Sequence, residues 1–262
     1  MKFKFGIGIL VLFVIWRSGF GAYAITGDEI IRKVDENMTY GTARSEATMV
    51  IHVGDEVRTK ELVSYSEGRE KSFAEFTAPA RDKGVKYLKI EDNMWMYLPS
   101  VDKIIKIAGH MLRQSMMGSD FSYEDALEST KLLEKYDVKL VAEETTYIKF
   151  RKGTEEVTKG RPCYVLDLTA KVKEVTYWQR KIWVDRETFV PVREELFAKS
   201  GKKLKVMNLG DVRKFGRRYY PMYITLQNLL RKDSLTEMFV DEIEFDVKIP
   251  PDTFSQRNLK KQ

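Results

Sequence analysis

Acidic residues are concentrated in the middle of the chain, where Asp120, Glu124 and Asp125 lie within one short segment. Carboxylates this close could bind a hard cation, but a calcium site needs roughly 6–8 oxygen ligands from a fixed loop, and the sequence contains no EF-hand pattern. The alternative is that Ser119 or Asp120 caps a helical turn that begins near Ser122. The sequence favours this capping role, and it predicts neither a metal site nor any other cofactor.

Nucleophilic catalysis would require a serine or cysteine beside a base. The chain has two histidines, His52 and His110, and a single cysteine, Cys163, but no Gly-x-Ser-x-Gly motif to expose a serine nucleophile. One cysteine also excludes an internal disulfide, a Cys/His zinc cage and a redox-active Cys-x-x-Cys pair. A lipid hydrolase that uses His52 or His110 is therefore the weaker alternative, and we expect a protein that is not an enzyme.

The first 24 residues have the three parts of a secretory signal peptide. A short basic start is followed by an uninterrupted apolar run over residues 6–16 and by the small-x-small motif Ala22-Tyr23-Ala24. Arg17 ends the apolar run before the roughly 20 residues that a membrane-spanning helix needs. We therefore expect cleavage after Ala24, export to the periplasm, and a single mature domain over residues 25–262.

Composition and charge narrow the class of partner. The 262 residues are 43% hydrophobic and 32% charged, which provides enough apolar material for a core and argues against a disordered chain. Loss of Lys2, Lys4 and Arg17 with the signal peptide would remove half of the formal net charge of +6. The remaining positive charges are interleaved with acidic residues, so we expect no nucleic-acid partner.

The elements that must position any site are mostly β-strands. A short amphipathic helix is predicted within residues 25–34, with Thr26 as its cap. Beyond it, apolar residues recur with a period of two between turn signals, which predicts antiparallel strands in series rather than βαβ units. The predicted strands are residues 44–53, 57–66, 70–77, 84–91, 93–99, 102–108, 136–151, 162–170, 176–185, 190–199, 202–212, 217–229 and 234–246.

Several of these strands have one apolar and one charged face. A sheet of about ten or more such strands must curl to keep its apolar face from water. An integral outer-membrane barrel would share export and alternation, but its lipid-facing band should be continuously apolar. The charges opposite the apolar face, and the basic tail after Phe254, favour a soluble protein instead.

The central interruption of the strand pattern is rich in methionine. Both faces of the segment 94–98 are bulky and apolar, which indicates a strand that is covered on both sides or lines a cavity. Met111, Leu112 and Met116 would lie on one side of a helical turn that ends at Gly118. Unbranched thioethers adapt to irregular apolar shapes, so this region suits a binding surface, although the same residues could simply fill the core.

Three ordered motifs occupy this central region. They are Met94-Trp95-Met96-Tyr97-Leu98-Pro99, the basic strand over residues 102–107, and Met117-Gly118-Ser119-Asp120-Phe121-Ser122-Tyr123-Glu124-Asp125. Their succession resembles the signature of the outer-membrane lipoprotein-sorting protein family, the LolA/LolB-like periplasmic carriers. The resemblance extends more loosely over the whole mature chain. It implies a mainly β (α+β) fold, an incomplete antiparallel β-barrel of about 11 strands with short helices plugging its concave face.

The resemblance also implies a carrier or chaperone that binds acyl chains of lipids or lipoproteins between barrel and helices, for transport toward the outer membrane. Its partners would be an inner-membrane transporter and an outer-membrane acceptor, and we expect a monomer. An arginine in an early strand, Arg44 or Arg58, would gate the closed state. Alternation does not reveal which strand face is concave, so it does not determine whether the two candidate tryptophans face the lipid site. The predicted lipid-binding residues are Met94, Trp95, Met96, Leu98, Met111, Leu112, Met116, Met117, Phe121 and Trp183.

Overall fold

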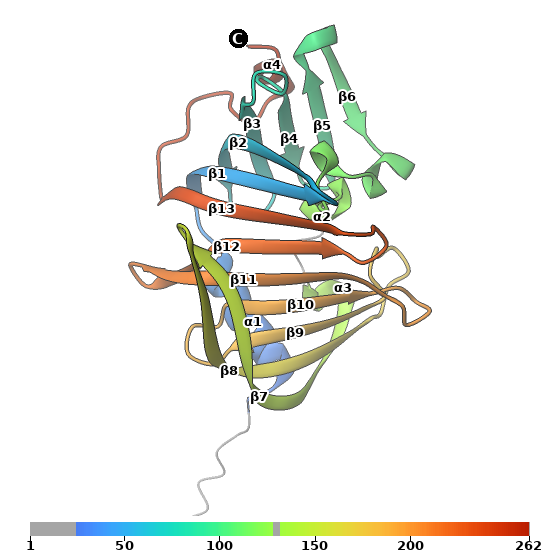
Figure 1. The fold of residues 1–262 in the computed structure, drawn as a ribbon, viewed down its shortest axis with the longest axis vertical. Helices are drawn as coiled ribbons and strands as arrows, with labels where there is room; N and C mark the ends of the chain where they lie inside the picture. The colour runs from blue at the N-terminus through green and yellow to red at the C-terminus, as the bar shows by residue number, and fades with distance from the viewer. Residues whose placement is uncertain (1–24, 128–131, 262) are drawn as a thin grey trace, which may run out of the picture.

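The computed structural model describes residues 25–127 and 132–261, so the predicted signal peptide lies outside the described residues. These residues form one antiparallel sheet of 13 strands in the order β6-β5-β4-β3-β2-β1-β13-β12-β11-β10-β9-β8-β7. The edges are β6 and β7, while the first and last strands of the chain pair with each other in the middle of the sheet (Figure 1). The sheet does not close on itself, which confirms the predicted incomplete barrel.

Each alternating segment of the sequence forms its own strand. All 13 segments predicted from the alternation are strands of this sheet, including β4 and β6 of five residues each, so the count is 13 rather than the about 11 that the resemblance implies. The strands are β1 (Thr42–Val53), β2 (Glu56–Glu67), β3 (Lys71–Ala78), β4 (Lys86–Ile90), β5 (Asn93–Leu98), β6 (Lys103–Ile107), β7 (Tyr136–Lys152), β8 (Glu155–Ala170), β9 (Gln179–Asp185), β10 (Pro191–Phe197), β11 (Lys203–Phe215), β12 (Arg218–Asn228) and β13 (Ser234–Phe245).

Short helices interrupt and flank the strands. They are α1 (Gly27–Met38), α2 (Tyr123–Leu127), α3 (Leu132–Lys135), α4 (Gln256–Leu259) and the 3₁₀ helices η1 (Pro99–Val101), η2 (Gly109–Arg113) and η3 (Met116–Gly118). Within the described residues, no helix combines the length and apolar content needed to cross a membrane.

Helix α1 begins where the sequence predicts. The side chains of Thr26 and Glu29 cap each other's backbone N–H groups, which completes a capping box. One face of the helix buries Ile30, Ile31 and Val34 against a cluster that includes Ile182 of β9. Packing of this apolar stripe, rather than helix propensity, holds such a short helix in place.

The two faces of the sheet are covered by different elements. We call the face that carries α1, η2, η3 and α2 the inner face, and the opposite one the outer face. Alternation along β5 places Met94 on the inner face with the 3₁₀ helices and Trp95 on the outer face. In β9, Ile182 likewise faces α1, while Trp183 faces outward.

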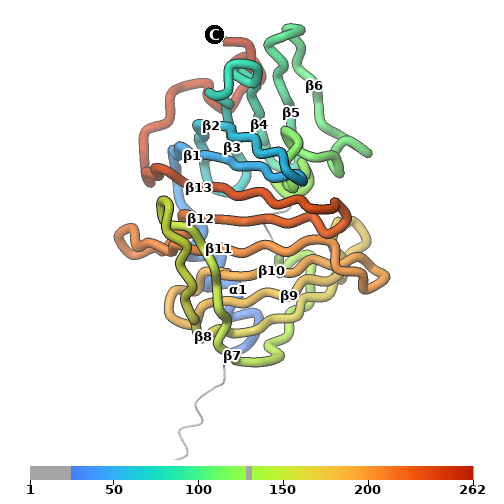
Figure 2. Tube along the Cα trace, in the orientation of Figure 1, coloured from blue at the N-terminus to red at the C-terminus, as the bar shows by residue number. Residues whose placement is uncertain are grey.

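Two elements cover the outer face. The long β7–β8 hairpin bends back over β11 and β12, so that its tip lies in front of the sheet in Figure 2 while α1 lies behind it. Gly210 of β11 permits this close approach, since a Cβ there would lie 2.3 Å from Cβ of Phe150. At the other end of the sheet, Leu259 of α4 packs with Phe73 and Leu88. Both halves of the sheet are therefore covered on two sides.

Candidate functional site

The candidate site is a cavity of about 460 Å³ on the inner face of the sheet. Its wall is formed by α1, by residues of β2–β4 and β9–β12, and by the central segment between β6 and β7. Most of its lining side chains are apolar, among them Val34, Met38, Ile182, Leu209, Ile224 and Leu226. Small-molecule sites in proteins have this combination of an apolar wall and a few polar groups.

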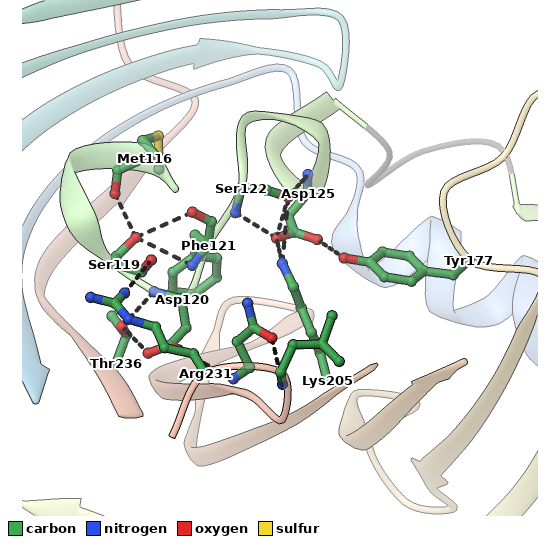
Figure 3. Close-up of polar contacts among 12 residues, drawn as sticks. Met116, Ser119, Asp120, Phe121, Ser122, Asp125, Tyr177, Lys205, Arg231 and Thr236 are labelled. Carbon is green, nitrogen blue, oxygen red and sulfur yellow. Dashed lines mark hydrogen bonds and ion pairs between the residues drawn. The ribbon is translucent and has the colours of Figure 1, made fainter. Parts of the chain in front are cut away.

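The central segment is anchored to β13 by Asp120, which is only 2% exposed. Its carboxylate accepts hydrogen bonds from the hydroxyls of Ser234 (2.6 Å) and Thr236 (2.7 Å) and from the backbone N–H of Asn228 (3.2 Å). Arg231 also donates hydrogen bonds to the carbonyl of Gly118 (2.9 Å) and to that of Ser119 (3.4 Å); Figure 3 shows Arg231 beside Ser119. A buried carboxylate with several donors is well stabilised, so this end of the segment is fixed.

A second anchor lies at α2. The Asp125 carboxylate forms a 2.5 Å ion pair with Lys205 of β11 and accepts a 2.5 Å hydrogen bond from the hydroxyl of Tyr177. Figure 3 shows Lys205 and Tyr177 approaching Asp125 from different elements. Asp125 also accepts from the backbone N–H of Ser122 (2.7 Å), whose hydroxyl accepts in return from the N–H of Asp125 (3.3 Å). This reciprocal pattern is a capping box at the start of α2.

The prediction that Ser119 or Asp120 caps this turn is therefore wrong. Ser122 and Asp125 make the cap, and Asp120 faces β13 instead because Ser234 and Thr236 offer it hydroxyl donors that the sequence does not reveal as neighbours. In the described parts of the chain, no group of three or more His, Cys, Asp or Glu side chains could hold a metal ion. Asp120 and Asp125 of the acidic cluster thus position the central segment.

Two of the ten predicted lipid-binding residues line the cavity. Met116 of η3 and Phe121, which precedes α2, both contribute to its wall. The carbonyl oxygens of both residues take part in the bonds of the central segment: Met116 accepts from Ser119, and Phe121 accepts from the N–H of Met116. The anchored loop therefore holds these two side chains at the cavity.

Six more predicted residues form a methionine-rich cluster beside the cavity. Met94 is buried there with Phe76 and Tyr87, and the other five predicted residues pack against this core while remaining partly exposed. These five are Met96, Leu98, Met111, Leu112 and Met117. The structure thus gathers them into one group on the inner face, next to the cavity wall but not in it.

The two remaining candidates, Trp95 and Trp183, are not brought to the cavity. Trp95 lies on the outer face with the cluster around Leu259. Trp183 lies beneath the β7–β8 hairpin, where its indole N–H donates a 2.6 Å hydrogen bond to Glu144. In each of these two strands, the residues next to the tryptophan face inward. Because successive side chains point to opposite faces of a sheet, the tryptophan itself faces outward.

Polar residues that sequence reasoning missed also line the cavity. Arg180 of β9 and Glu194 of β10 form a buried ion pair with a 3.0 Å contact. Lys89 of β4 is only 5% exposed, and its ammonium donates a 3.1 Å hydrogen bond to the carbonyl of Ala126. Burial lowers the pKa of Lys89 below the ordinary lysine value of 10.5. In the sequence, these residues could be noticed only as breaks in the apolar pattern of their strands. The sequence does not show which of the charges meet, because that depends on the register of the strands.

The residues considered for nucleophilic catalysis lie apart. His52 is on the outer face, 2.8 Å from Glu237, and His110 lies in η2. In the part of the chain that the structure describes, neither histidine has a hydrogen bond to a serine or cysteine. Cys163 is buried, and burial raises the pKa of its thiol to about 11, which disfavours the reactive thiolate.

The two candidate gating arginines also separate. Arg44 pairs with Glu46 and lies 3.8 Å from Glu244, toward the outer face. Arg58 is next to the central segment, because a Cβ on Gly118 would lie 3.3 Å from its guanidinium nitrogen. Only Arg58 is placed where it could affect the position of η3.

The chain is similar to one protein family and to several solved structures. A family model described as an uncharacterized protein matches residues 68–261. A DUF1329 family protein from Desulfovibrio piger is 26% identical, with a TM-score of 0.78 over 89% of this chain and 97% of that one. Among proteins with curated descriptions, none matches the sequence.

Two further crystal structures share the fold. A domain named for outer-membrane lipoprotein sorting, from Vibrio parahaemolyticus, is 21% identical with a TM-score of 0.74 and covers 90% of this chain and 98% of its own. A LolA superfamily protein from Nitrosomonas europaea is 21% identical with a TM-score of 0.69 and covers 90% and 100%. Both structures share the fold of this chain. Because the family model spans most of the sequence, the chain belongs to the family of uncharacterized proteins that this model describes.

Proposed function

We propose that this protein is a periplasmic, non-enzymatic carrier that holds acyl chains of a lipid or lipoprotein in the inner-face cavity and conveys them toward the outer membrane. The observation that carries the proposal is the cavity itself, about 460 Å³ with a mainly apolar wall between sheet and helices. The fold shared with lipoprotein-sorting structures supports the same reading.

The free energy available for binding is sufficient. Each methylene group moved from water into an apolar site contributes about 0.8 kcal/mol, so ten buried methylenes would contribute roughly 8 kcal/mol before the cost of immobilising the ligand. The side chains of Ile182, Leu209 and Leu226 supply such a surface. Larger cargo would require the covering helices to move.

The methionine-rich cluster is suited to that movement. Met111, Leu112 and Met117 are only partly buried, and two glycines with positive φ, Gly109 (58°) and Gly118 (80°), bound the segment that contains them. Flexible thioethers can repack against ligands of different shape. In this proposal residues 109–117 form the movable cover, while the anchors at Asp120 and Asp125 hold its C-terminal end.

Delivery would need partners at both membranes. We propose an inner-membrane transporter as the source of cargo and an outer-membrane acceptor as its destination, as the resemblance of the central motifs to lipoprotein-sorting proteins implies. The protein would act between them as a monomer and cleavage after Ala24 would release it into the periplasm.

The direct test is lipid binding by the mature protein and by a variant with a filled cavity. Met207→Trp adds bulk to the cavity wall, whereas Val141→Trp makes a comparable addition at an exposed position of β7. We expect lipid to co-purify with the wild type and with Val141→Trp, and affinity for a fluorescent fatty acid to fall about tenfold or more in Met207→Trp. No binding by any of the three proteins, measured by native mass spectrometry and fluorescence, would refute the proposal.

A further inference from the structure

Three polar side chains form a row across adjacent strands of the inner face. Ser66 of β2 pairs with Ser72 of β3, and Ser72 pairs with Lys89 of β4. Directly opposed residues in antiparallel strands have Cβ atoms about 4.5–5.5 Å apart and point to the same face. All three residues line the cavity, so two hydroxyls and one ammonium are presented to it side by side.

Among the residues that the structure describes, the ammonium of this row has no carboxylate partner within ion-pair distance. Other cations of the cavity wall are neutralised: Arg69 pairs with Asp35 at 2.8 Å and Arg180 pairs with Glu194 at 3.0 Å. Among the described residues, no acidic oxygen lies within 4.0 Å of the Lys89 ammonium, which donates only to the Ala126 carbonyl. A buried charge left with one neutral acceptor is expensive to maintain.

The two serine hydroxyls of the row are also available to donate hydrogen bonds to a ligand. Neither Ser66 nor Ser72 has a side-chain hydrogen bond to another described residue, and both are partly exposed to the cavity. Together with Lys89 they offer charge-assisted and neutral donors to a single acceptor group. That donor set matches an oxyanion with two or more oxygens, such as a carboxylate or a phosphate.

We propose that Ser66, Ser72 and Lys89 bind the anionic headgroup of an acidic lipid whose acyl chain lies along the apolar remainder of the cavity. This inference rests on the proposed carrier function and adds the chemical class of the cargo. The anion supplies the missing counter-charge for Lys89, whereas a neutral headgroup leaves it uncompensated. The site therefore selects acids over alcohols that carry the same chain.

The test compares ligands that share one chain: oleate, oleyl phosphate and oleyl alcohol, with inorganic phosphate as the headgroup alone. We expect the wild type to bind both acids about tenfold or more tightly than the alcohol, and to bind inorganic phosphate weakly, because the chain provides most of the affinity. Comparison of the two acids shows whether carboxylate or phosphate fits better.

Two variants and one matched control identify the residues. Lys89→Met should abolish the preference for acids while leaving affinity for oleyl alcohol within about threefold, and Ser72→Ala should reduce the preference about threefold. Lys86→Met removes an equally buried lysine of the same strand, which bonds to the carbonyl of Lys261, and should keep the preference. Circular dichroism checks that each variant is folded.

The outcomes separate the two proposals. If the wild type binds oleate and oleyl alcohol equally, or if Lys89→Met retains its preference, the headgroup site is refuted while the carrier function stands. If none of the three lipids binds, the carrier function is refuted, and the headgroup site with it. If only inorganic phosphate binds, the row is a site for free anions rather than lipids, which also overturns the inference.

Discussion

Asp125 of α2 and Lys205 of β11 are joined by a buried ion pair of 2.5 Å, although 80 residues separate them in sequence. The contact ties the central helical segment to the half of the sheet that follows it. Because Lys205 is also close to the hydroxyl of Ser122, at 3.4 Å, the cap of α2 and the tie to the sheet share one cation. The position of α2 and its stability are therefore coupled.

Asp125→Asn should lower the free energy of unfolding by about 3–5 kcal/mol, because it leaves the Lys205 ammonium buried without a counter-ion. Urea denaturation followed by circular dichroism measures the change. Asp102→Asn is the control, since it breaks an exposed pair with Lys260 and should change stability by less than about 1 kcal/mol. Equal effects of the two substitutions would contradict a structural role for the buried pair.

Lys89→Met should raise stability at neutral pH rather than lower it. Burial depresses the pKa of Lys89 in the folded protein, against the pull of Asp92 and Glu70 and with the help of Lys135. The Lys89 ammonium therefore binds its proton less tightly in the folded state than in the unfolded state. The destabilisation caused by burying this charge is complete below the folded-state pKa and diminishes as pH rises from there toward 10.5.

The measurement is the melting temperature of wild type and Lys89→Met as a function of pH. Their difference should be largest near neutral pH and shrink as the pH becomes alkaline, with roughly 2–4 °C expected for each kcal/mol. Lys86→Met should instead destabilise the fold, because Lys86 bonds to the Lys261 carbonyl. A lower melting temperature for Lys89→Met across the whole range would show that this lysine is a structural residue.

Gly210→Ala should detach the tip of the β7–β8 hairpin from the outer face. Its new methyl group would lie 2.3 Å from Cβ of Phe150, so strand or side chain must shift at a cost of about 1–3 kcal/mol. Gly41→Ala is the matched control, since its Cβ would meet only an oxygen of Asp246 at 3.5 Å.

Hydrogen exchange of residues around Phe150 reports the detachment directly. Combining Gly210→Ala with Phe150→Gly should give a loss smaller than the sum of the single losses, because glycine at position 150 removes both the Cβ and the ring that the new methyl group would meet. Strict additivity would mean that the hairpin tip does not pack as the structure has it.

The strands could be predicted from sequence because one wet and one covered face impose a period of two along each strand. The same rule does not say which face is inner, so Trp95 and Trp183 could not be assigned to a face from alternation alone. Their positions depend on whether their neighbours meet α1 and the 3₁₀ helices or the β7–β8 hairpin. That is a tertiary contact with no local signature.

The polar part of the cavity could not be predicted from sequence for a related reason. Ser66, Ser72 and Lys89 are unremarkable in sequence and become neighbours only through the register of β2, β3 and β4. Asp120 illustrates the same limit, since a local cap is the simplest reading of its position, yet its partners lie on β13. Local chemistry predicts the elements, whereas register decides which side chains share a site.

The pairing of β1 with β13 has a kinetic consequence. Ala43 is opposite Phe245, so the sheet acquires its central seam only when nearly the whole chain is available. Contacts this distant in sequence make folding slow, and until they form, β1 presents an unpaired edge. In the export route that we propose, this delay keeps the polypeptide from completing its structure before it crosses the membrane, and its unpaired strand edges must be shielded from aggregation until β13 is available.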